Sequence, residues 1–301
     1  MAQFNRIFKL TAGVQGAQGV EIASDGTQES LRITFEIDRD LTQQTNKSNI
    51  KIYNLAPATA KKLEKADTIA LLEVGYAEDI GLRRIFVGAV TSASTRQEDV
   101  DVETSLEVSD GQIAMRDTIL SLGYSNGVHG EKIFNDIAVQ MGLITYIAPD
   151  VVFPTYSNGY SYIGKAAPCL DKICAAAGAT WSIQNNVLQV ILAGGNTNIK
   201  ALVFAADSGL VGTPERIVEG VKRPDKNAQK KRKVKKDKHE KKAGWRINVL
   251  LAPTLNPGDL VKVESKYLDG WFKIESLRHT GDTHGQDWYT ELELIELKVE
   301  E

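Results

Sequence analysis

Residues 49–90 read NIKIYNLAPATAKKLEKADTIALLEVGYAEDIGLRRIFVGAV, and the order of apolar and polar residues in this stretch indicates the fold. Residues 49–55 predict a strand. Pro57 then opens a short helix, because proline in the first turn of a helix loses no hydrogen bond. Apolar strands follow at 69–74 and 84–90, and the second leads into a long alternating hairpin that closes on Ser109-Asp110-Gly111. Such a pattern is typical of a barrel plugged or capped by one helix.

Alternation extends toward the N-terminus. Residues 8–13 and 31–37 alternate apolar with polar side chains, which is the period of a half-buried strand. Asp25-Gly26 predicts a turn between these two segments. Many short strands separated by turn residues indicate a barrel or a sandwich, so the first third of the chain is expected to be mainly β.

The composition changes near residue 118, where helical patterns begin. Two helices and a hairpin are predicted, at 130–142, 166–177 and 180–192. The first helix is amphipathic and is expected to end at Gly142, and Asn185-Asn186 is a good turn for the hairpin. A loop rich in Pro, Tyr, Gly and Ser is expected at 149–162. This segment therefore predicts a small α/β module between two β regions.

The last third returns to a β pattern. Strands are predicted at 244–249, 260–263, 271–277 and 288–295. Pro257-Gly258-Asp259 predicts a turn before the second of these strands, and residues 279–285 predict a turn before the last. Tryptophans stand at three of the strand starts and are expected in a barrel core or as interface anchors: Trp245, Trp271 and Trp288.

Short motifs recur in a definite order along the chain. They are Ile52-Tyr53-Asn54-Leu55, Gly75-Tyr76, Phe86-Val87-Gly88, Pro257-Gly258-Asp259, Trp271-Phe272 and His279-x-Gly281-Asp282. In this order they resemble the central hub protein of contractile phage tail baseplates, and the spike proteins of type VI secretion use a related domain. The resemblance implies a mainly β (α+β) fold with two similar β-barrel tube-type domains, at 1–118 and 198–301. A small α/β linker module at 119–197 would separate them.

The same resemblance implies a role in assembly, without an enzymatic reaction. Three copies would form a homotrimer whose six similar barrels give pseudo-six-fold symmetry. The ring would join the hexameric tail tube, or a tube-adaptor protein, to the trimeric spike. The expected location is the tail baseplate of a virion or of a phage-derived injection particle, assembled in the host bacterial cytoplasm. The family implies no catalytic residue, no cofactor and no metal ion.

Charge is distributed unevenly along the chain. Residues 222–242 contain twelve Lys or Arg and three acids, a net charge of +9, so the remainder carries −12 of the total −3. This segment, an insertion in the second barrel, has no counterpart in the resemblance. It holds no aromatic residue, so base stacking is unavailable and only charge can attract a partner. The candidate partner-binding residues are Lys230, Lys231, Arg232, Lys233, Lys235 and Lys236.

The partners that charge alone would select are acidic surfaces. Neighbouring subunits, the tape-measure protein and the genome passing through the tube are the candidates, and a solvated hairpin tip with no partner is the alternative. The chain has no apolar run long enough to span a bilayer, so no membrane insertion is expected. Its N-terminus lacks the layout of a signal peptide, which predicts synthesis in a reducing cytosol.

Motifs for catalysis or metal binding are missing from the sequence. It contains no G-x-S-x-G, no H-E-x-x-H and no glycine-rich phosphate loop. His279, Asp282 and His284 are of types that bind metals, but their spacing within 279–285 favours a turn. Cys169 and Cys174 are five residues apart in a helical pattern, which favours buried free thiols over a redox or zinc pair.

Two alternatives from other functional classes remain open on the sequence. In the first, segment 129–192 binds a host cell-wall glycan and the barrels serve as a scaffold. In the second, the chain is a cell-wall hydrolase. A glycan pull-down with that segment and an assay for hydrolysis of cell-wall material discriminate between these and the structural role.

Overall fold

The computed structural model describes residues 5–24, 30–79, 81–218 and 244–297. It is 55% strand and 14% helix, which confirms the expected mainly β (α+β) class. We name its parts the N-terminal β region (5–110), the middle region (111–197) and the C-terminal β region (198–218 and 244–297). Among the described residues, no helix is both long and apolar enough to cross a membrane. The predicted turn at Asp25-Gly26 lies outside the described residues.

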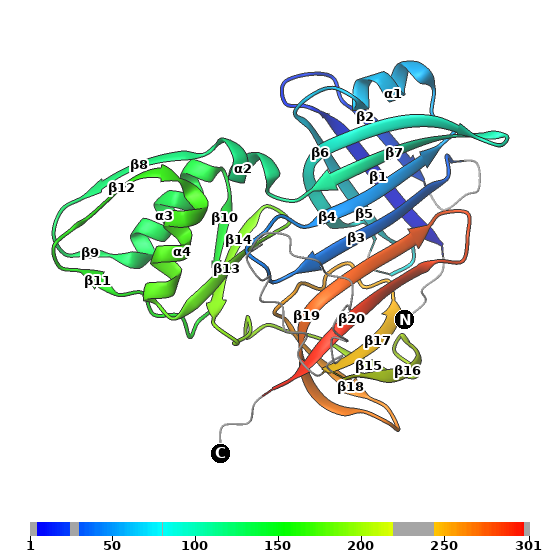
Figure 1. Ribbon diagram of the computed structural model, residues 1–301. Coiled ribbons are helices and arrows are strands. Elements are labelled where there is room, and N and C mark those ends of the chain that lie inside the picture. The colour runs from blue at the N-terminus through cyan, green and yellow to red at the C-terminus, as the bar shows by residue number, and fades with distance from the viewer. Residues whose placement is uncertain (1–4, 25–29, 80, 219–243, 298–301) are drawn as a thin grey trace, which may run out of the picture.

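The N-terminal β region is a curled sheet with one helix against it (Figure 1). Its elements are β1 (Arg6–Val14), β2 (Val20–Ser24), β3 (Ile33–Asp40), β4 (Lys47–Tyr53), α1 (Pro57–Leu63), β5 (Thr68–Tyr76), β6 (Arg83–Glu98) and β7 (Asp101–Ser109). They pair in the order β3-β4-β7-β6-β5-β1-β2. The strands alternate buried with accessible residues, as β3 does from Ile33 to Asp40, so one face encloses an aliphatic and aromatic core.

The C-terminal β region continues the same sheet. Its strands are β15 (Lys200–Ala205), β16 (Leu210–Ile217), β17 (Gly244–Leu250), β18 (Leu260–Glu264), β19 (Asp269–Asp282) and β20 (Trp288–Glu296). β19 pairs with β20 and β18 on its own side and with β3 on the other. The two β regions, each with its own hydrophobic core, are therefore joined into one 13-stranded sheet. Leu251 and Trp288 of the C-terminal β region even belong to the N-terminal core.

The middle region extends to one side of this sheet (Figure 1). Its elements are α2 (Gln112–Asp117), β8 (Ile119–Tyr124), β9 (Val128–His129), α3 (Gly130–Met141), β10 (Ile144–Ile147), β11 (Thr155–Tyr156), β12 (Tyr160–Lys165), α4 (Ala166–Ala176), β13 (Ala179–Gln184) and β14 (Val187–Leu192). Helices α3 and α4 pack between a ribbon of β8 with β12 and a sheet in the order β10-β14-β13. This region has its own buried core.

Most predicted elements are present. The turn at Asn185-Asn186 is a two-residue hairpin in which both residues have positive φ, 50° and 67°, the conformation that asparagine tolerates best after glycine. Gly142 ends α3 in the left-handed conformation as expected.

Two expectations at the residue level are wrong. The loop expected at 149–162 contains β11 and the start of β12, because β8 supplies a partner strand for Tyr160 to Lys165. The turn expected at 279–285 is shorter, because residues 279–282 still belong to β19: residues 279–281 pair with both β20 and β3, and Asp282 pairs with β3.

Candidate functional site at the seam between the two β regions

The site that joins the parts of the molecule is the seam between β3 and β19. The two strands run antiparallel from the pair Thr34–Asp282 to the pair Asp40–Ser276. Midway along it, on the solvent face, Arg278 donates from Nε to Asp38 Oδ1 at 2.5 Å and from Nη2 to Oδ2 at 3.2 Å. Backbone hydrogen bonds and this fork-shaped ion pair fix the register of the seam.

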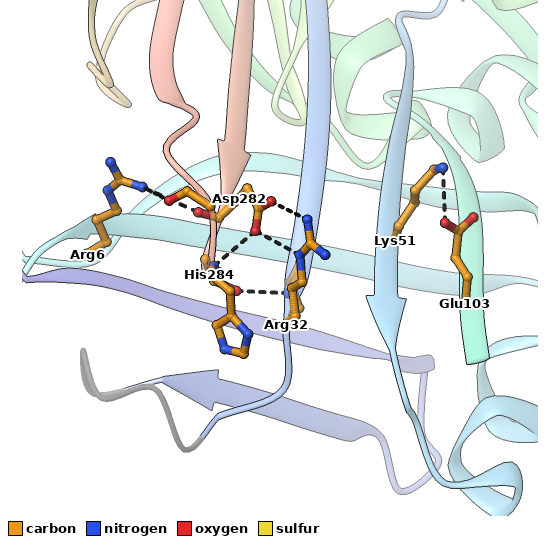
Figure 2. A network of polar contacts seen from close by, with 9 residues as sticks. Arg6, Arg32, Lys51, Glu103, Asp282 and His284 are labelled. Atoms are coloured by element: carbon orange, nitrogen blue, oxygen red, sulfur yellow. Dashed lines mark hydrogen bonds and ion pairs between the residues drawn. The ribbon is translucent and has the colours of Figure 1, made fainter. Parts of the chain in front are cut away.

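At one end of the seam, Asp282 forms an ion-paired clasp (Figure 2). Its carboxylate accepts from Arg32 Nε at 3.1 Å and Nη2 at 2.6 Å, and from the backbone N–H of His284 at 3.0 Å. Arg6, at the start of β1, reaches the same turn and donates to the carbonyl oxygens of Gly285 at 2.8 Å and Gln286 at 3.0 Å. Two arginines of the N-terminal β region thus hold the β19–β20 turn.

Electrostatics at the clasp favour the ionised carboxylate. Burial by itself raises the pKa of Asp282, but the hydrogen bonds from Arg32 and from the backbone N–H groups of His284 and Gly285 outweigh it and leave the pKa lowered. The Asp282 side chain is 11% exposed, whereas that of Arg32 is 41% exposed. Figure 2 also shows the Lys51–Glu103 ion pair on the neighbouring strands β4 and β7, with Nζ and Oε2 3.1 Å apart.

A glycine is required beside the clasp. Gly281 lies opposite Phe35 in the seam, and a Cβ at this position would lie 2.2 Å from Phe35 Cζ. The Phe35 ring in turn meets Trp288 edge to face, with centroids 5.5 Å apart. Phe35 and Trp288 therefore pack together across the seam only because residue 281 has no side chain.

At the other end of the seam, Arg39 is buried among neutral acceptors. It lies at an inward-facing position of β3 and is only 3% exposed. Its Nε donates to Gln184 Oε1 at 3.2 Å, its Nη1 to the Leu255 carbonyl at 3.4 Å, and its Nη2 to Asn256 Oδ1 at 2.7 Å. When the side-chain amide of Asn185 is oriented so that both its nitrogen and its oxygen form hydrogen bonds, its oxygen also accepts from Arg39 Nη1, at 3.1 Å. One guanidinium therefore connects all three regions.

Three turns that lie far apart in the sequence meet around Arg39. They are Ser109-Asp110-Gly111, Asn185-Asn186 and Pro257-Gly258-Asp259. Asp110 accepts from the backbone N–H of Asn185 at 2.5 Å and of Asn186 at 3.4 Å. Asp259 accepts from Thr197 Oγ1 at 2.8 Å and from the backbone N–H of Asn256 at 3.1 Å. We call Arg39, Asp110, Gln184, Asn185, Asn256 and Asp259 the Arg39 junction.

Burial perturbs the ionisable groups of this junction. It lowers the pKa of Arg39 to about 10, against the opposing charges of Asp110 and Asp259. It raises the pKa of Asp110 to about 6, although the charge of Arg39 opposes the change, and it also raises the pKa of Asp259. His279, on the adjacent β19, is fully buried with Nδ1 2.8 Å from Thr290 Oγ1. Burial and then the charge of Arg39 lower its pKa to about 3.

The structure separates the residues that the sequence offered as a metal cluster. His279 is inside the fold, Asp282 is ion-paired with Arg32, and His284 lies in the turn with Nε2 3.1 Å from the carbonyl oxygen of Ser30. Across the described ranges, no three His, Cys, Asp or Glu side chains are placed to hold a metal ion. Cys169 and Cys174 are buried free thiols, as predicted.

The basic segment 222–242 cannot be placed in this geometry. Its six candidate residues, Lys230, Lys231, Arg232, Lys233, Lys235 and Lys236, lie outside the described residues.

In segment 129–192, the alternative glycan-binding segment, tyrosine hydroxyl groups contact other residues of the middle region. Tyr160 Oη lies 3.4 Å from Cys169 Sγ, and Tyr162 donates to the Lys165 carbonyl at 2.9 Å.

Sequence reasoning did not single out the Arg39 junction, although two signals for it were present. The alternation of β3 continues from Ile33, Phe35 and Ile37 to Arg39, which places a charged residue on the core face. The three turns were predicted as turns, but nothing local to Asp110 or Asp259 indicates that their carboxylates face the same arginine. Such a meeting of distant segments depends on the tertiary fold.

Comparison with solved structures shows which proteins share this fold. The 43 kDa tail protein of prophage MuSo2 from Shewanella oneidensis matches with a TM-score of 0.60 at 13% identity, over 96% of this chain and 98% of that chain. A tail protein from Neisseria meningitidis MC58 matches with a TM-score of 0.58 at 12% identity, over 95% and 96% of the two chains.

A third match comes from a secretion system. The E. coli c3393 protein, described as a type VI secretion component similar to the T4 phage tail proteins gp27 and gp5, gives a TM-score of 0.56 at 10% identity, over 95% of this chain and 77% of that one. No curated protein matches the sequence. The sequence model of the baseplate hub gp41 family matches residues 12–223, which cover the N-terminal β region from residue 12 onward, the middle region, and strands β15 and β16 of the C-terminal β region. The chain therefore belongs to the baseplate hub gp41 family and is a structural protein of the phage tail.

Proposed function

We propose that the chain acts as a homotrimeric hub that joins the hexameric tail tube to the trimeric spike. The observation that carries this proposal is the seam, because it combines two β regions into one sheet and holds them in a fixed relation. Three chains, each with two β regions, then present six β regions to the hexameric tube and a three-fold symmetric surface to the trimeric spike. A ring of this kind arises from a repeated heterologous contact that closes after three copies.

The proposed hub has three domains, at 1–118, 119–197 and 198–301. Three separate hydrophobic cores support this division, although two side chains of the last segment pack into the first core. The role is assembly without catalysis. Assembly takes place in the host bacterial cytoplasm, and the partners are further copies of the chain, a tube or tube-adaptor protein and the spike.

Stoichiometry in the assembled baseplate tests the proposal. The chain is co-expressed with its genomic neighbours in the tail cluster, and the complexes are analysed by native mass spectrometry and cryo-electron microscopy. Three copies per particle, in contact with tube on one side and spike on the other, are expected. Two, four or six copies, or a position away from the tube axis, contradict it. Loss of the complex in a variant that breaks the Arg39 junction, such as Arg39→Ala, would show that the fixed relation of the β regions is required.

We also propose that the basic segment 222–242 docks on acidic surfaces through charge alone. The support is its net charge of +9 beside a remainder of −12. Single exposed ion pairs contribute about 0–1 kcal/mol, so only many together have an effect, and salt screens them beyond about 8–10 Å.

A variant set separates this role from a solvated tip. Lys230, Lys231, Arg232, Lys233, Lys235 and Lys236 are replaced by Ser, and the matched control replaces the five lysines by Arg, which keeps the charge. The Ser variant should keep its melting temperature and lose partner binding, most strongly at low salt, while the control behaves as the parent. Equal assembly and infectivity of Ser variant and parent at all ionic strengths contradict the docking role.

A further inference from the structure

An aromatic surface on the C-terminal β region is built like the centre of an interface. Val203, Lys262 and Trp271 are neighbours across β15, β18 and β19 on one sheet face, and Tyr267 stands in the turn between β18 and β19. Trp271 is 37% exposed, Val203 45% and Tyr267 61%. Exposed Trp and Tyr beside aliphatic residues are the composition of interface hot spots.

Two lysines lie on the aromatic rings of this surface. Lys200 Nζ is 5.3 Å from the centroid of the Trp271 ring, and Lys266 Nζ is 5.6 Å from that of Tyr267. Neither lysine has an ion-pair partner among the residues that the structure describes, whereas Lys262 pairs with Glu264. We call Lys200, Val203, Lys262, Lys266, Tyr267 and Trp271 the Trp271 patch. It is an apolar surface with two cations available for an acidic partner.

The tip of the β6–β7 hairpin has the complementary character. Glu98 pairs with Asp101, so Asp99 and Val100 form a two-residue turn, with Asp99 at φ 52°. Val100 is 92% exposed, in a position that hairpins normally give to Gly, Asn or another polar turn residue. Three acidic residues, Glu98, Asp99 and Asp101, flank Val100 in sequence, and Asp101 Oδ1 accepts from Asn54 Nδ2 at 2.8 Å. No contact within the described chain accounts for a valine at this position.

Patch and tip cannot meet within one molecule. In Figure 1 the β6–β7 tip projects beyond the sheet at one extreme of the protein, whereas β18 and the start of β19 lie at the other. A contact between them is therefore intermolecular and heterologous, with different surfaces on the two copies, and such contacts repeat until they close.

We propose that the hairpin tip of one copy docks on the Trp271 patch of a second copy, with Val100 against the aromatic rings and the carboxylates facing Lys200 and Lys266. The proposal rests on the homotrimeric hub and specifies the contact between its neighbours. Charge complementarity supports the choice of occupant, because an acidic apolar knob meets a basic apolar surface. The apolar centre supplies most of the affinity, and the exposed charges supply orientation and rate of association.

Cysteine cross-linking between two purified single variants tests the contact directly. Val100→Cys protein is mixed with Val203→Cys protein under mild oxidation, and the mixed disulfide dimer is followed on non-reducing gels with the two proteins tagged to different sizes. The native Cys169 and Cys174 are buried. The control pairs Val100→Cys with Ile163→Cys, whose position in the middle region is 82% exposed. Docking should make the Val203 pair react on the order of tenfold faster than the control, because docking raises the effective thiol concentration.

Charge reversal provides a second, independent readout on the same assay. Lys200→Glu with Lys266→Glu in the Val203→Cys protein should slow cross-linking at low salt. Glu98→Lys with Asp99→Lys in the Val100→Cys protein should restore it, since the pair is then complementary again. The rescue requires both partners and is not explained by a folding defect in one of them.

The outcomes separate this contact from the hub role. If the Val203 pair reacts no faster than the Ile163 control, the tip-to-patch contact is wrong even when baseplates still contain three copies. If Val203→Cys in assembled baseplates cross-links to a different tail protein, the patch has another occupant and the contact is again wrong. If the contact forms but the particle holds a number of copies other than three, the trimeric hub fails and the contact stands.

Discussion

The two ends of the β3–β19 seam hold the same β regions together by opposite physical means. At the Asp282 clasp a carboxylate meets a partly exposed arginine as an ion pair. At the Arg39 junction a fully buried arginine is surrounded by amide and carbonyl oxygens, and the nearest carboxylates act on it only through their charge. Water can replace the lost partner at the clasp, but not at the junction. The two ends should therefore respond very differently to substitution.

The largest effect is expected for Arg39→Ala. The substitution leaves Gln184 Oε1, Asn256 Oδ1 and the Leu255 carbonyl without their donor in a buried site, and breaking a buried charged network costs about 3–5 kcal/mol. Urea unfolding followed by tryptophan fluorescence measures the loss. Arg39→Lys is the matched control, because it keeps the charge and loses the fork of donors. If Arg39→Ala loses less stability than Asp282→Ala, the contrast between the two ends is reversed.

A smaller loss is expected for Asp282→Ala. The substitution removes the acceptor for Arg32 and for the backbone N–H of His284, but Arg32 is half exposed and can be hydrated, so about 1–2 kcal/mol is expected. Because the ion pair is accessible, the difference between Asp282→Ala and parent should shrink in 1 M salt, whereas that between Arg39→Ala and parent should not. Equal salt dependence at both ends would show that the clasp is as well shielded as the junction.

Asp110 in the Arg39 junction and His279 on the adjacent β19 should make the stability depend on pH in opposite directions. Asp110 has a folded pKa of about 6, above its unfolded value, so it adds stability as the pH falls below 6. His279 has a folded pKa of about 3, below its unfolded value of 6.5, so stability present above pH 6.5 is lost as the pH falls toward 3. The two effects oppose each other between pH 6 and pH 4. The positive charges of Arg39 and Arg84 act to lower the pKa of Asp110, but the effect of burial is larger and the pKa stays raised.

Replacing Asp110 by Asn should therefore steepen the acid loss of stability. Between pH 7.5 and pH 5 the variant should lose about 1 kcal/mol more than the parent, because it lacks the compensating proton uptake. Unfolding midpoints in urea at the two pH values measure this difference. An acid loss equal to that of the parent would mean that Asp110 is not the group that titrates near pH 6.

The smallest effect is expected for the ion pair midway along the seam. Arg278 and Asp38 are both about half exposed, so Arg278→Ala should change the free energy of unfolding by no more than about 0.5 kcal/mol. Urea unfolding at low and high salt gives the value. A loss as large as that for Asp282→Ala would show that position along the seam, and not burial, decides how much each contact contributes.

Much of the secondary structure was predictable because its signals are local. Alternation identified β1 and β3, Pro57 the start of α1, and Asn185-Asn186 the hairpin turn of the middle region. The expected loop at 149–162 was wrong because polar residues with glycine predict irregular chain, whereas β12 depends on hydrogen bonds to β8. When a strand forms mainly because a neighbouring strand is available to pair with it, its own sequence gives only a weak strand signal.

The candidate site was predictable only in fragments. The sequence indicated three turns and an inward-facing position at residue 39, but not that they coincide. The clearest functional signal in the sequence is the high density of Lys and Arg at 222–242. The role of this segment stays a prediction. Asp282 was considered as a metal ligand because of its neighbours in sequence, and its partner, Arg32, is 250 residues away.

The sequence by itself determined the class of protein, because the periods of apolar residues and the order of turn motifs already indicate strands around apolar cores and a resemblance to baseplate hubs. Tertiary structure decided that the two β regions share one sheet, since the pairing of β3 with β19 joins residues about 240 apart through backbone groups that every residue carries. It also decided the charge states of Arg39, Asp110 and His279. A pKa depends on what surrounds the group after folding, and for these residues the surroundings come from distant segments of the chain.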